Sequence, residues 1–184
     1  AIMAAIGQAT KHGVIIKSGE SLEKMGKVNT IAFDKTGTLT YGRLEVSDII
    51  PFDGIGEEEL LSLTASAEGK SEHPLGKAIV ACAKAKNMTM VESAAFKMTA
   101  GKGIYAEVSG KKLLCGNEDY LQGNGVSIGE DVKAELSRLR TQGKASILVA
   151  EGDACIGIIA MSDVLRPEAK DMVSRLTAMH TSTV

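Results

Sequence analysis

One seven-residue stretch joins a carboxylate to groups that bind phosphate. Asp34 is followed by Lys-Thr-Gly-Thr-Leu-Thr at residues 35–40, and the largely apolar run Val28–Phe33 before it predicts a buried β-strand. In α/β sheets, ligands bind beyond the carboxyl ends of the strands. The glycine and the threonines offer backbone N–H groups and hydroxyls to phosphate oxygens. The stretch therefore predicts an aspartate that accepts a phosphoryl group.

A second group of residues has the chemistry of a nucleotide pocket. Residues 71–76 read SEHPLG, and Glu68 stands just before them. Aromatic residues make up only 3% of the chain, so the planar imidazole of His73 could stack on adenine in their place. Glu68 could accept a hydrogen bond from the exocyclic amine of adenine. Further along, Gly101 and Gly103 lack side chains, so that backbone can approach a ribose or a phosphate closely; taken alone, the two are also typical of a hairpin turn.

The two motifs together resemble one family of ion pumps. DKTGTLT resembles the P-type ATPases, which phosphorylate the aspartate of DKTGT, and SEHPLG resembles their heavy-metal-transporting branch. The resemblance covers essentially the whole chain and implies ATP as substrate and Mg²⁺ as cofactor. In that branch four elements line the ATP pocket, and the residues that match them here are Glu68, His73, Gly101, Gly103, Gly116 and Asn117.

The same resemblance implies roles for the residues around the aspartate. Asp34 is the nucleophile that attacks the γ-phosphorus of ATP, and its carboxylate and the backbone carbonyl of Thr36 hold Mg²⁺. Thr38 contacts the transferred phosphoryl group through its side chain, whereas Lys35 faces away. Thr36 stands where dehalogenase-like phosphatases usually carry a second aspartate as general acid and base. Because a hydroxyl of ordinary acidity is a poor general base, the aspartyl-phosphate should persist, which favours a pump over a phosphatase.

Two polar residues of the expected pocket have alternative interpretations. Asn117 could donate a hydrogen bond to the nucleotide, cap a helix that begins at Glu118, or do both. Asp163 lies in a segment that resembles the hinge by which the chain returns to the phosphorylation domain, near the nucleotide when the domains close. A helix N-cap is an equally good interpretation of Asp163.

The sulfur-containing residues and the other histidines suggest no further site. No CxxC pair is present, and the three cysteines are expected to be small core residues: Cys82, Cys115 and Cys155. Alternation favours half-buried strand positions over a copper site for three methionines: Met88, Met90 and Met98. His12 and His180 have no partner in the sequence and are assigned no role.

Composition limits the function classes. The formal net charge is −2, with 21 basic and 23 acidic residues and no basic patch interleaved with aromatics, which argues against nucleic-acid binding. No apolar run approaches the roughly 20 residues needed to span a bilayer, and no signal peptide is visible, so we expect a soluble chain. The apolar opening Ala1–Ile6 looks like the cytoplasmic end of a membrane helix, with a buried amphipathic helix as the alternative.

Periodicity divides the chain into two ends and a middle. For the ends it predicts helices over 1–12, over 18–25 with Ser18 as N-cap, and over 167–180, and a short strand over 14–16. For the middle it predicts helices over 57–68, 74–86 and 129–142 and strands over 90–98, 103–108, 111–115, 146–150 and 154–161.

These elements predict one domain inserted into another. The expected fold is an incomplete, haloacid-dehalogenase-like α/β phosphorylation domain that carries an inserted α+β nucleotide-binding domain on an antiparallel sheet. The expected boundaries are 1–43 for the first part of the phosphorylation domain, 44–158 for the insertion and 159–184 for the return.

Several motifs of the family do not occur in these 184 residues. They are the TGD motif, the phosphate-binding lysine and the later GDGxND. We therefore expect the chain to bind ATP but to turn it over poorly, because much of the electrostatic stabilisation of phosphoryl transfer is missing. In the intact pump this segment would lie on the cytoplasmic side of a membrane, beside the membrane helices and the actuator domain, with a metallochaperone as a further partner. The alternatives are a soluble dehalogenase-like phosphatase and a non-catalytic nucleotide-sensing or docking module.

Overall fold

A computed structural model describes residues 2–184, which form two compact units. Ala1, the first residue of the apolar opening, lies outside the described residues. The larger unit runs from Gly42 to Val164, and the smaller unit contains the chain up to Tyr41 and from Leu165 onward. In the described part of the chain, no helix has the length and apolar character needed to cross a membrane.

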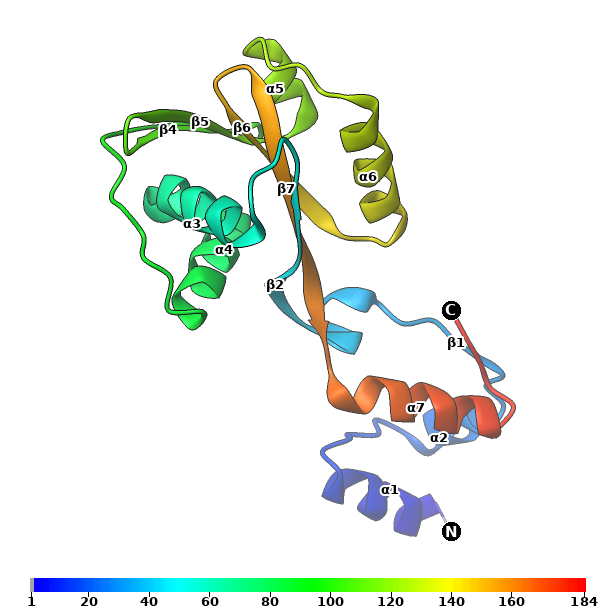
Figure 1. The fold of residues 1–184 in the computed structure, drawn as a ribbon. Coiled ribbons are helices and arrows are strands. Elements are labelled where there is room, and N and C mark those ends of the chain that lie inside the picture. The colour runs from blue at the N-terminus through cyan, green and yellow to red at the C-terminus, as the bar shows by residue number, and fades with distance from the viewer. Residues whose placement is uncertain (1) are drawn as a thin grey trace. The chain divides into compact units, whose positions relative to one another are not determined.

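The larger unit is built on a six-stranded sheet with the order β2-β7-β6-β5-β4-β3 (Figure 1). Each neighbouring pair from β3 to β7 is antiparallel, which confirms the antiparallel sheet expected for the middle of the chain. The strands are β2 (Thr40–Pro51), β3 (Ala95–Thr99), β4 (Gly103–Val108), β5 (Lys111–Gly116), β6 (Ala145–Glu151) and β7 (Ala154–Leu165). The helices are α3 (Glu57–Ala67), the short η2 (Glu68–Lys70), α4 (Pro74–Ala85), α5 (Glu118–Gly123) and α6 (Glu130–Thr141).

Helices cover both faces of this sheet (Figure 1). Successive side chains of a strand point to opposite faces, and β6 shows the consequence. Ile147 and Val149 belong to a core shared with α3 and α4, whereas Leu148 and Ala150 belong to a core shared with α5 and α6. Both cores are mainly aliphatic, as expected for a chain with 3% aromatic residues and no tryptophan.

A glycine sets how closely α3 approaches the sheet. Gly157 in β7 pairs with Val149 of β6. A Cβ atom on Gly157 would overlap the side chain of Leu60 and would lie 3.0 Å from the carbonyl oxygen of Ile50. Leu60 is fully buried, so a shift that makes room for a methyl group must also displace its neighbours in the core.

The smaller unit contains short elements from both ends of the chain. They are α1 (Ile2–Lys11), α2 (Gly19–Met25), β1 (Thr30–Ile31), the five-residue turn η1 (Lys35–Leu39), α7 (Pro167–Ala178) and β8 (Ser182–Thr183). β1 and β8 pair in parallel, which agrees with the α/β character expected for the ends. The expected N-cap of α2 is present, because the Ser18 hydroxyl accepts a hydrogen bond of 3.1 Å from the Ser21 N–H.

The strand predictions for the first 33 residues are wrong in two places. Residues 14–16 form no strand, and Ile15 is 85% exposed. The segment Val28–Phe33 contains only the two-residue strand β1, and none of its side chains is buried. β-branched residues form a stable strand when neighbouring strands and a covering layer pack against them. In the described residues β1 has β8 as its single neighbour.

The strand predicted over 90–98 begins later, at Ala95. Met88 and Met90 pack against the core of α3 and α4 before the strand starts, so the interpretation of these two as strand residues is wrong. Met98 does lie in β3 and is 44% exposed. All three cysteines are free, and Cys115 and Cys155 are buried as predicted.

Replacing Gly157 should test the close approach of α3. Gly157→Ala should lower the free energy of unfolding by about 1–3 kcal/mol, because Leu60 or the helix must shift to admit a methyl group. Chemical denaturation monitored by circular dichroism measures this change. Gly123→Ala is a matched control, since a Cβ atom there meets nothing within 4 Å. Equal stability of the two variants would contradict this account.

Candidate functional site

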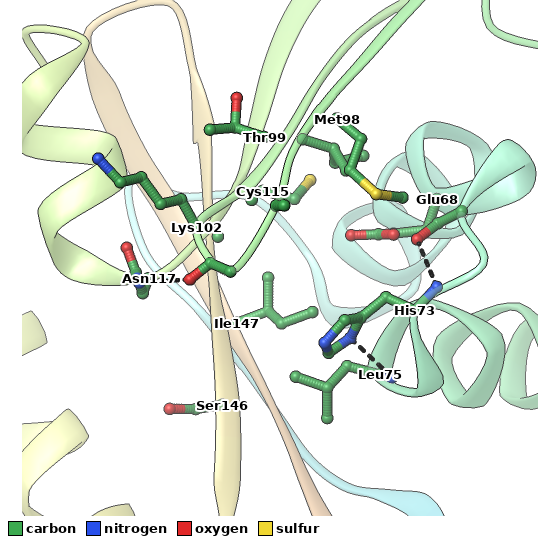
Figure 2. A pocket seen from close by; sticks show the side chains of 16 residues that line it. Glu68, His73, Leu75, Met98, Thr99, Lys102, Cys115, Asn117, Ser146 and Ile147 are labelled. Carbon is green, nitrogen blue, oxygen red and sulfur yellow. Dashed lines mark hydrogen bonds between the residues drawn. The ribbon is translucent and has the colours of Figure 1, made fainter.

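A pocket of about 200 Å³ opens in the larger unit, between the start of α4, the β3–β4 turn, the end of β5 and the start of β6 (Figure 2). It brings together six of the residues that the sequence predicted for a nucleotide site: Glu68, His73, Gly101, Gly103, Gly116 and Asn117. The side chains of Leu75 and Ile147 add apolar wall. An apolar pocket with a few convergent polar groups is the usual form of a small-molecule site.

Glu68 is the most unusual group in this pocket. It follows the last turn of α3 and is only 3% exposed. Burial raises the pKa of its carboxyl above the ordinary value, and a hydrogen bond from the Ser71 hydroxyl works in the opposite direction. In the described part of the chain no lysine, arginine or histidine forms a salt bridge with Glu68. An ionisable group that is buried without a cation is characteristic of functional sites.

The space that the Glu68 side chain occupies depends on a glycine of α4. A Cβ atom on Gly76 would overlap Oε2 of Glu68 and would lie 2.8 Å from Oγ of Ser71. The Ser71 N–H also donates to the Glu68 carbonyl oxygen at 2.8 Å, which closes the short turn between the two residues. The last residue of SEHPLG therefore gives the carboxylate its space.

His73 begins α4 and presents its ring to the pocket (Figure 2). Its Nδ1 accepts a hydrogen bond of 3.3 Å from the Leu75 N–H, so His73 is the N-cap, and Pro74 follows as the first helical residue. Because Nδ1 is an acceptor, the neutral ring carries its proton on Nε2. The capping hydrogen bond thus holds the imidazole ring in one orientation, while its face remains exposed.

The opposite wall is formed by two glycines that face each other. Gly103 of β4 pairs with Gly116 of β5, and the ring of Tyr120 packs against both. A Cβ atom on Gly103 would overlap the carbonyl oxygen of Cys115. The missing side chains therefore allow two strands and one ring to pack closely, and they leave the backbone to line the pocket.

The β3–β4 turn and α5 are tied together at the pocket edge. Gly101 has φ +70°, a conformation that favours glycine. Nδ2 of Asn117 donates to the Gly101 carbonyl oxygen at 3.4 Å, and Oδ1 of Asn117 accepts from the Tyr120 N–H at 2.9 Å. Asn117 is thus the N-cap of α5, as one interpretation of the sequence had it.

Lys102 adds a positive charge to the pocket, and Cys115 adds an uncharged thiol. The side chain of Lys102 extends from the β3–β4 turn near Asn117 (Figure 2). Among the described residues that line the pocket, it is the one lysine or arginine. Burial raises the pKa of the Cys115 thiol well above its ordinary value, and the nearby Glu68 adds to this. The thiol is therefore a neutral part of the pocket lining.

The phosphoryl-acceptor candidate lies on a loop of the smaller unit. Asp34 is exposed and stands directly before η1, yet its side chain makes no capping hydrogen bond. Gly37 has φ +79°. The Thr40 hydroxyl accepts from the Gly37 N–H at 3.2 Å and donates to the Lys35 carbonyl oxygen at 3.0 Å. The loop is thus closed by its own last threonine, and the carboxylate of Asp34 is left open to solvent.

The loop offers hard oxygen ligands of the type that Mg²⁺ prefers. Asp34 supplies a carboxylate, and Thr36, with extended backbone at φ −77° and ψ 120°, lies two residues on. Thr38 is exposed on the same loop. No cluster of three histidine, cysteine or acidic residues that could hold a metal occurs in residues 2–184. Mg²⁺ is commonly held by one or two carboxylates together with substrate phosphates and waters, so this ligand set fits an ion that arrives with a nucleotide.

Asp163 lies apart from the pocket residues. It belongs to β7, and its Oδ1 accepts a hydrogen bond of 2.9 Å from the Arg43 N–H of β2. The interpretation of Asp163 as a helix N-cap is wrong, because the N-cap of α7 is Arg166.

Some residues of the pocket were not predicted. Gly76, which makes room for Glu68 although it does not line the pocket itself, belongs to SEHPLG, and Lys102 stands between the two predicted glycines, but neither residue has a predicted role. A glycine in the first turn of a helix could have indicated this role. Glycine destabilises a helix, so its presence there suggests that a side chain would clash with a neighbour. Ser146 and Ile147 carry no such signal, because sheet pairing with β5 brings β6 to the pocket.

Replacing the buried carboxyl should stabilise the fold. The folded state holds the Glu68 proton more tightly than the unfolded chain, so wild-type stability falls as pH rises from the ordinary pKa of 4.5 through the raised value. Glu68→Gln should therefore be more stable at neutral pH, by about 1 kcal/mol. The difference should shrink as the pH falls toward 4.5. Thermal unfolding across this pH range measures both effects.

The control for this experiment is Glu72→Gln. Glu72 lies four residues on, is 85% exposed and pairs with Lys77, so its replacement should change stability little. A Glu68→Gln variant that is less stable than wild type at neutral pH would show that the carboxylate is well accommodated.

Comparison with known proteins places the chain in a family. Residues 28–182 match the haloacid dehalogenase-like hydrolase family. The copper-exporting P-type ATPase of Bacillus subtilis (strain 168) is 38% identical over 175 residues, which are 95% of this chain and 22% of that protein. The chain thus spans about a fifth of the length of such curated relatives.

Solved structures give a consistent picture. A zinc-transporting PIB-type ATPase in its E2.Pi state matches all of this chain and 30% of its own, with 36% identity and a TM-score of 0.84. The N-domain of HMA8, a copper-transporting P-type ATPase, matches 64% of this chain and 99% of its own, with 26% identity and a TM-score of 0.55. The chain therefore belongs to the haloacid dehalogenase-like hydrolases, and its resemblance to the heavy-metal P-type ATPases is confirmed.

Proposed function

We propose that this chain binds ATP in the pocket of its larger unit and that Asp34 accepts the γ-phosphoryl group in the full-length protein. One observation carries the proposal. Residues from six elements, η2, α4, β3, β4, β5 and β6, converge on one pocket that has a planar ring, a buried carboxyl and a cation around apolar walls. That combination suits a ligand with a flat, polar-edged base at one end and negative charge at the other.

The adenine end of the ligand would lie between His73, Leu75 and Ile147. The exposed imidazole offers its face for stacking, and the two aliphatic side chains offer apolar contact. The Glu68 carboxylate, seated on Gly76, would accept a hydrogen bond from the exocyclic amine. A bound amine would satisfy a carboxylate that has no cation of its own.

The phosphate end of the ligand would lie near the β3–β4 turn. Lys102 supplies positive charge there, and Gly101 leaves room for backbone to approach a ribose or a phosphate. Asn117 holds this turn against α5, so the turn is preorganised for the ligand.

Asp34 would form a new bond from a carboxylate oxygen to the γ-phosphorus, with ADP as the leaving group. The Asp34 carboxylate and the Thr36 carbonyl would hold Mg²⁺, which supplies neutralisation of phosphate charge when it is bound. Thr38 would contact the transferred group. Because Thr36 cannot serve as an efficient general base, hydrolysis of the aspartyl-phosphate would be slow without other domains, which supports a pump rather than a soluble phosphatase.

We further propose that the full-length protein is a membrane pump that uses this phosphorylation to transport a heavy-metal cation. The names of its relatives, copper-exporting and zinc-transporting ATPases, support that assignment. This segment would then lie on the cytoplasmic side and contact the membrane helices and the actuator domain, with a metallochaperone as a further partner. Asp163 belongs to the same unit as the pocket but lies outside its lining, so a contact with the nucleotide would need a rearrangement within the larger unit.

The proposed stacking of His73 on adenine can be tested separately from its role as the N-cap of α4. His73→Ala should weaken ATP binding at least tenfold in calorimetric titration, because it removes the stacking ring; it also removes the N-cap, which the next variant restores. His73→Asn keeps a good N-cap acceptor without a ring, and it should bind ATP as weakly as the alanine variant. His12→Ala, at an exposed position of the smaller unit, is the control. Unchanged affinity in His73→Ala, or full recovery in His73→Asn, would overturn the stacking proposal.

The isolated chain should phosphorylate itself only weakly when it is given ATP. Incubation with γ-labelled ATP and Mg²⁺ should leave little label on the protein, because motifs that stabilise the transfer are not in this sequence. Asp34→Asn sets the background. Robust labelling that disappears in Asp34→Asn would contradict the expected weak turnover, while it would support Asp34 as the acceptor.

A further inference from the structure

Arg166, from the C-terminal segment of the smaller unit, holds the loop that follows Asp34. Its backbone N–H and its guanidinium donate three hydrogen bonds to loop carbonyl oxygens. These are the bonds from N to Leu39 at 2.9 Å, from Nε to Thr40 at 3.2 Å and from Nη2 to Gly37 at 3.3 Å. A planar fork with several donors suits this task, since one side chain can orient two carbonyl groups at once.

Two neighbours fix Arg166 itself. Its guanidinium carbon lies 4.7 Å from the centre of the Tyr41 ring, in a cation–π contact. Pro167 follows it and starts α7, and a residue before proline is restricted to extended backbone. Arg166 has φ −66° and ψ 134°, as that restriction requires. The side chain therefore reaches the loop from a constrained position.

These contacts fix both peptide groups of Gly37. Its N–H donates to the Thr40 hydroxyl at 3.2 Å, and its carbonyl oxygen accepts from Arg166. A trans peptide is planar, with the C=O and the next N–H on opposite sides. The N–H of Thr38 therefore points away from Arg166. Without these two bonds Gly37, at φ +79°, would be free to turn both peptide planes.

We propose that Arg166 is a positioning residue for phosphoryl transfer: it sets the Gly37–Thr38 peptide so that the Thr38 N–H is available to an oxygen of the phosphoryl group on Asp34. The proposal rests on the proposed role of Asp34 as acceptor. Arg166 would act through the loop, because two of its guanidinium donors are engaged with loop carbonyl oxygens. Preorganised donors of this type are a main source of transition-state stabilisation.

The loop geometry can be tested on the chain itself by amide hydrogen exchange measured by NMR. Arg166→Ala should speed exchange at Gly37 and Thr40 at least tenfold and shift the Thr38 amide resonance, whereas amides of β4 and β5 should not change. Arg166→Lys should be intermediate, because it keeps the charge without the fork. Arg175→Ala, on the same helix but 79% exposed and paired with Asp171, should match wild type. Unchanged loop amides in Arg166→Ala would overturn the inference.

The functional consequence can be tested in the full-length protein that contains this segment. Arg166→Ala should lower the rate of phosphoenzyme formation at saturating ATP at least tenfold, while the ATP concentration for half-saturation stays unchanged. Arg166→Lys should recover part of the rate. A full recovery in Arg166→Lys would indicate a contact of its charge with phosphate and would overturn the positioning role. Persistent phosphorylation of Asp34→Asn would instead refute the proposed acceptor and leave the loop measurements standing.

Discussion

A carboxyl group buried without a cation is the constraint around which the larger unit is arranged. Glu68 is 97% removed from solvent, and the Ser71 hydroxyl is the group that lowers its pKa against the effect of burial. One neutral hydrogen bond offsets only part of the cost of burying such a group. The end of α3, the turn that follows it and the start of α4 must therefore keep fixed positions relative to one another around the carboxyl. Gly76 makes this possible, because any side chain there would occupy the space of the carboxyl.

The same constraint explains the rest of the pocket. Since α4 starts next to Glu68, its N-cap His73 is placed beside the carboxyl, and the paired strand ends at Gly103 and Gly116 close the other side. Burial of the Glu68 carboxyl is expected to destabilise the free protein, and in the proposed complex a hydrogen bond from the ligand to Glu68 would offset that cost. Stability is commonly reduced in this way at functional sites.

The loop of Asp34 is organised in the opposite manner. Its carboxylate is exposed and makes no capping hydrogen bond, whereas the backbone around it is held by the Thr40 hydroxyl and by Arg166. One residue belongs to the loop itself, and the other returns to it from a position 129 residues further along the chain. An open carboxylate on a fixed backbone suits a nucleophile, which must meet its substrate without rearranging its surroundings.

The sequence predicted the local elements better than the distant contacts. The helices of the larger unit and its antiparallel strands follow from periodicity, because capping and turn chemistry are local. The six residues of the pocket follow from the resemblance to the heavy-metal P-type ATPases that two motifs carry. The strands at 14–16 and 28–33 are predicted from short apolar runs, but strands need neighbours, and these segments have few in the described chain. Ile147 and Arg166 reach their sites through sheet pairing and chain return, which no spacing in the sequence encodes.

The most direct test of the account is a map of amide shifts in the ¹⁵N-labelled chain during titration with ATP. The account predicts saturable shifts at residues 68–76, 101–104 and 116–117, with small changes in α6 on the opposite face of the sheet. Shifts that spare these segments and appear elsewhere, or no saturable shift at all, would contradict the assignment of this pocket to the nucleotide.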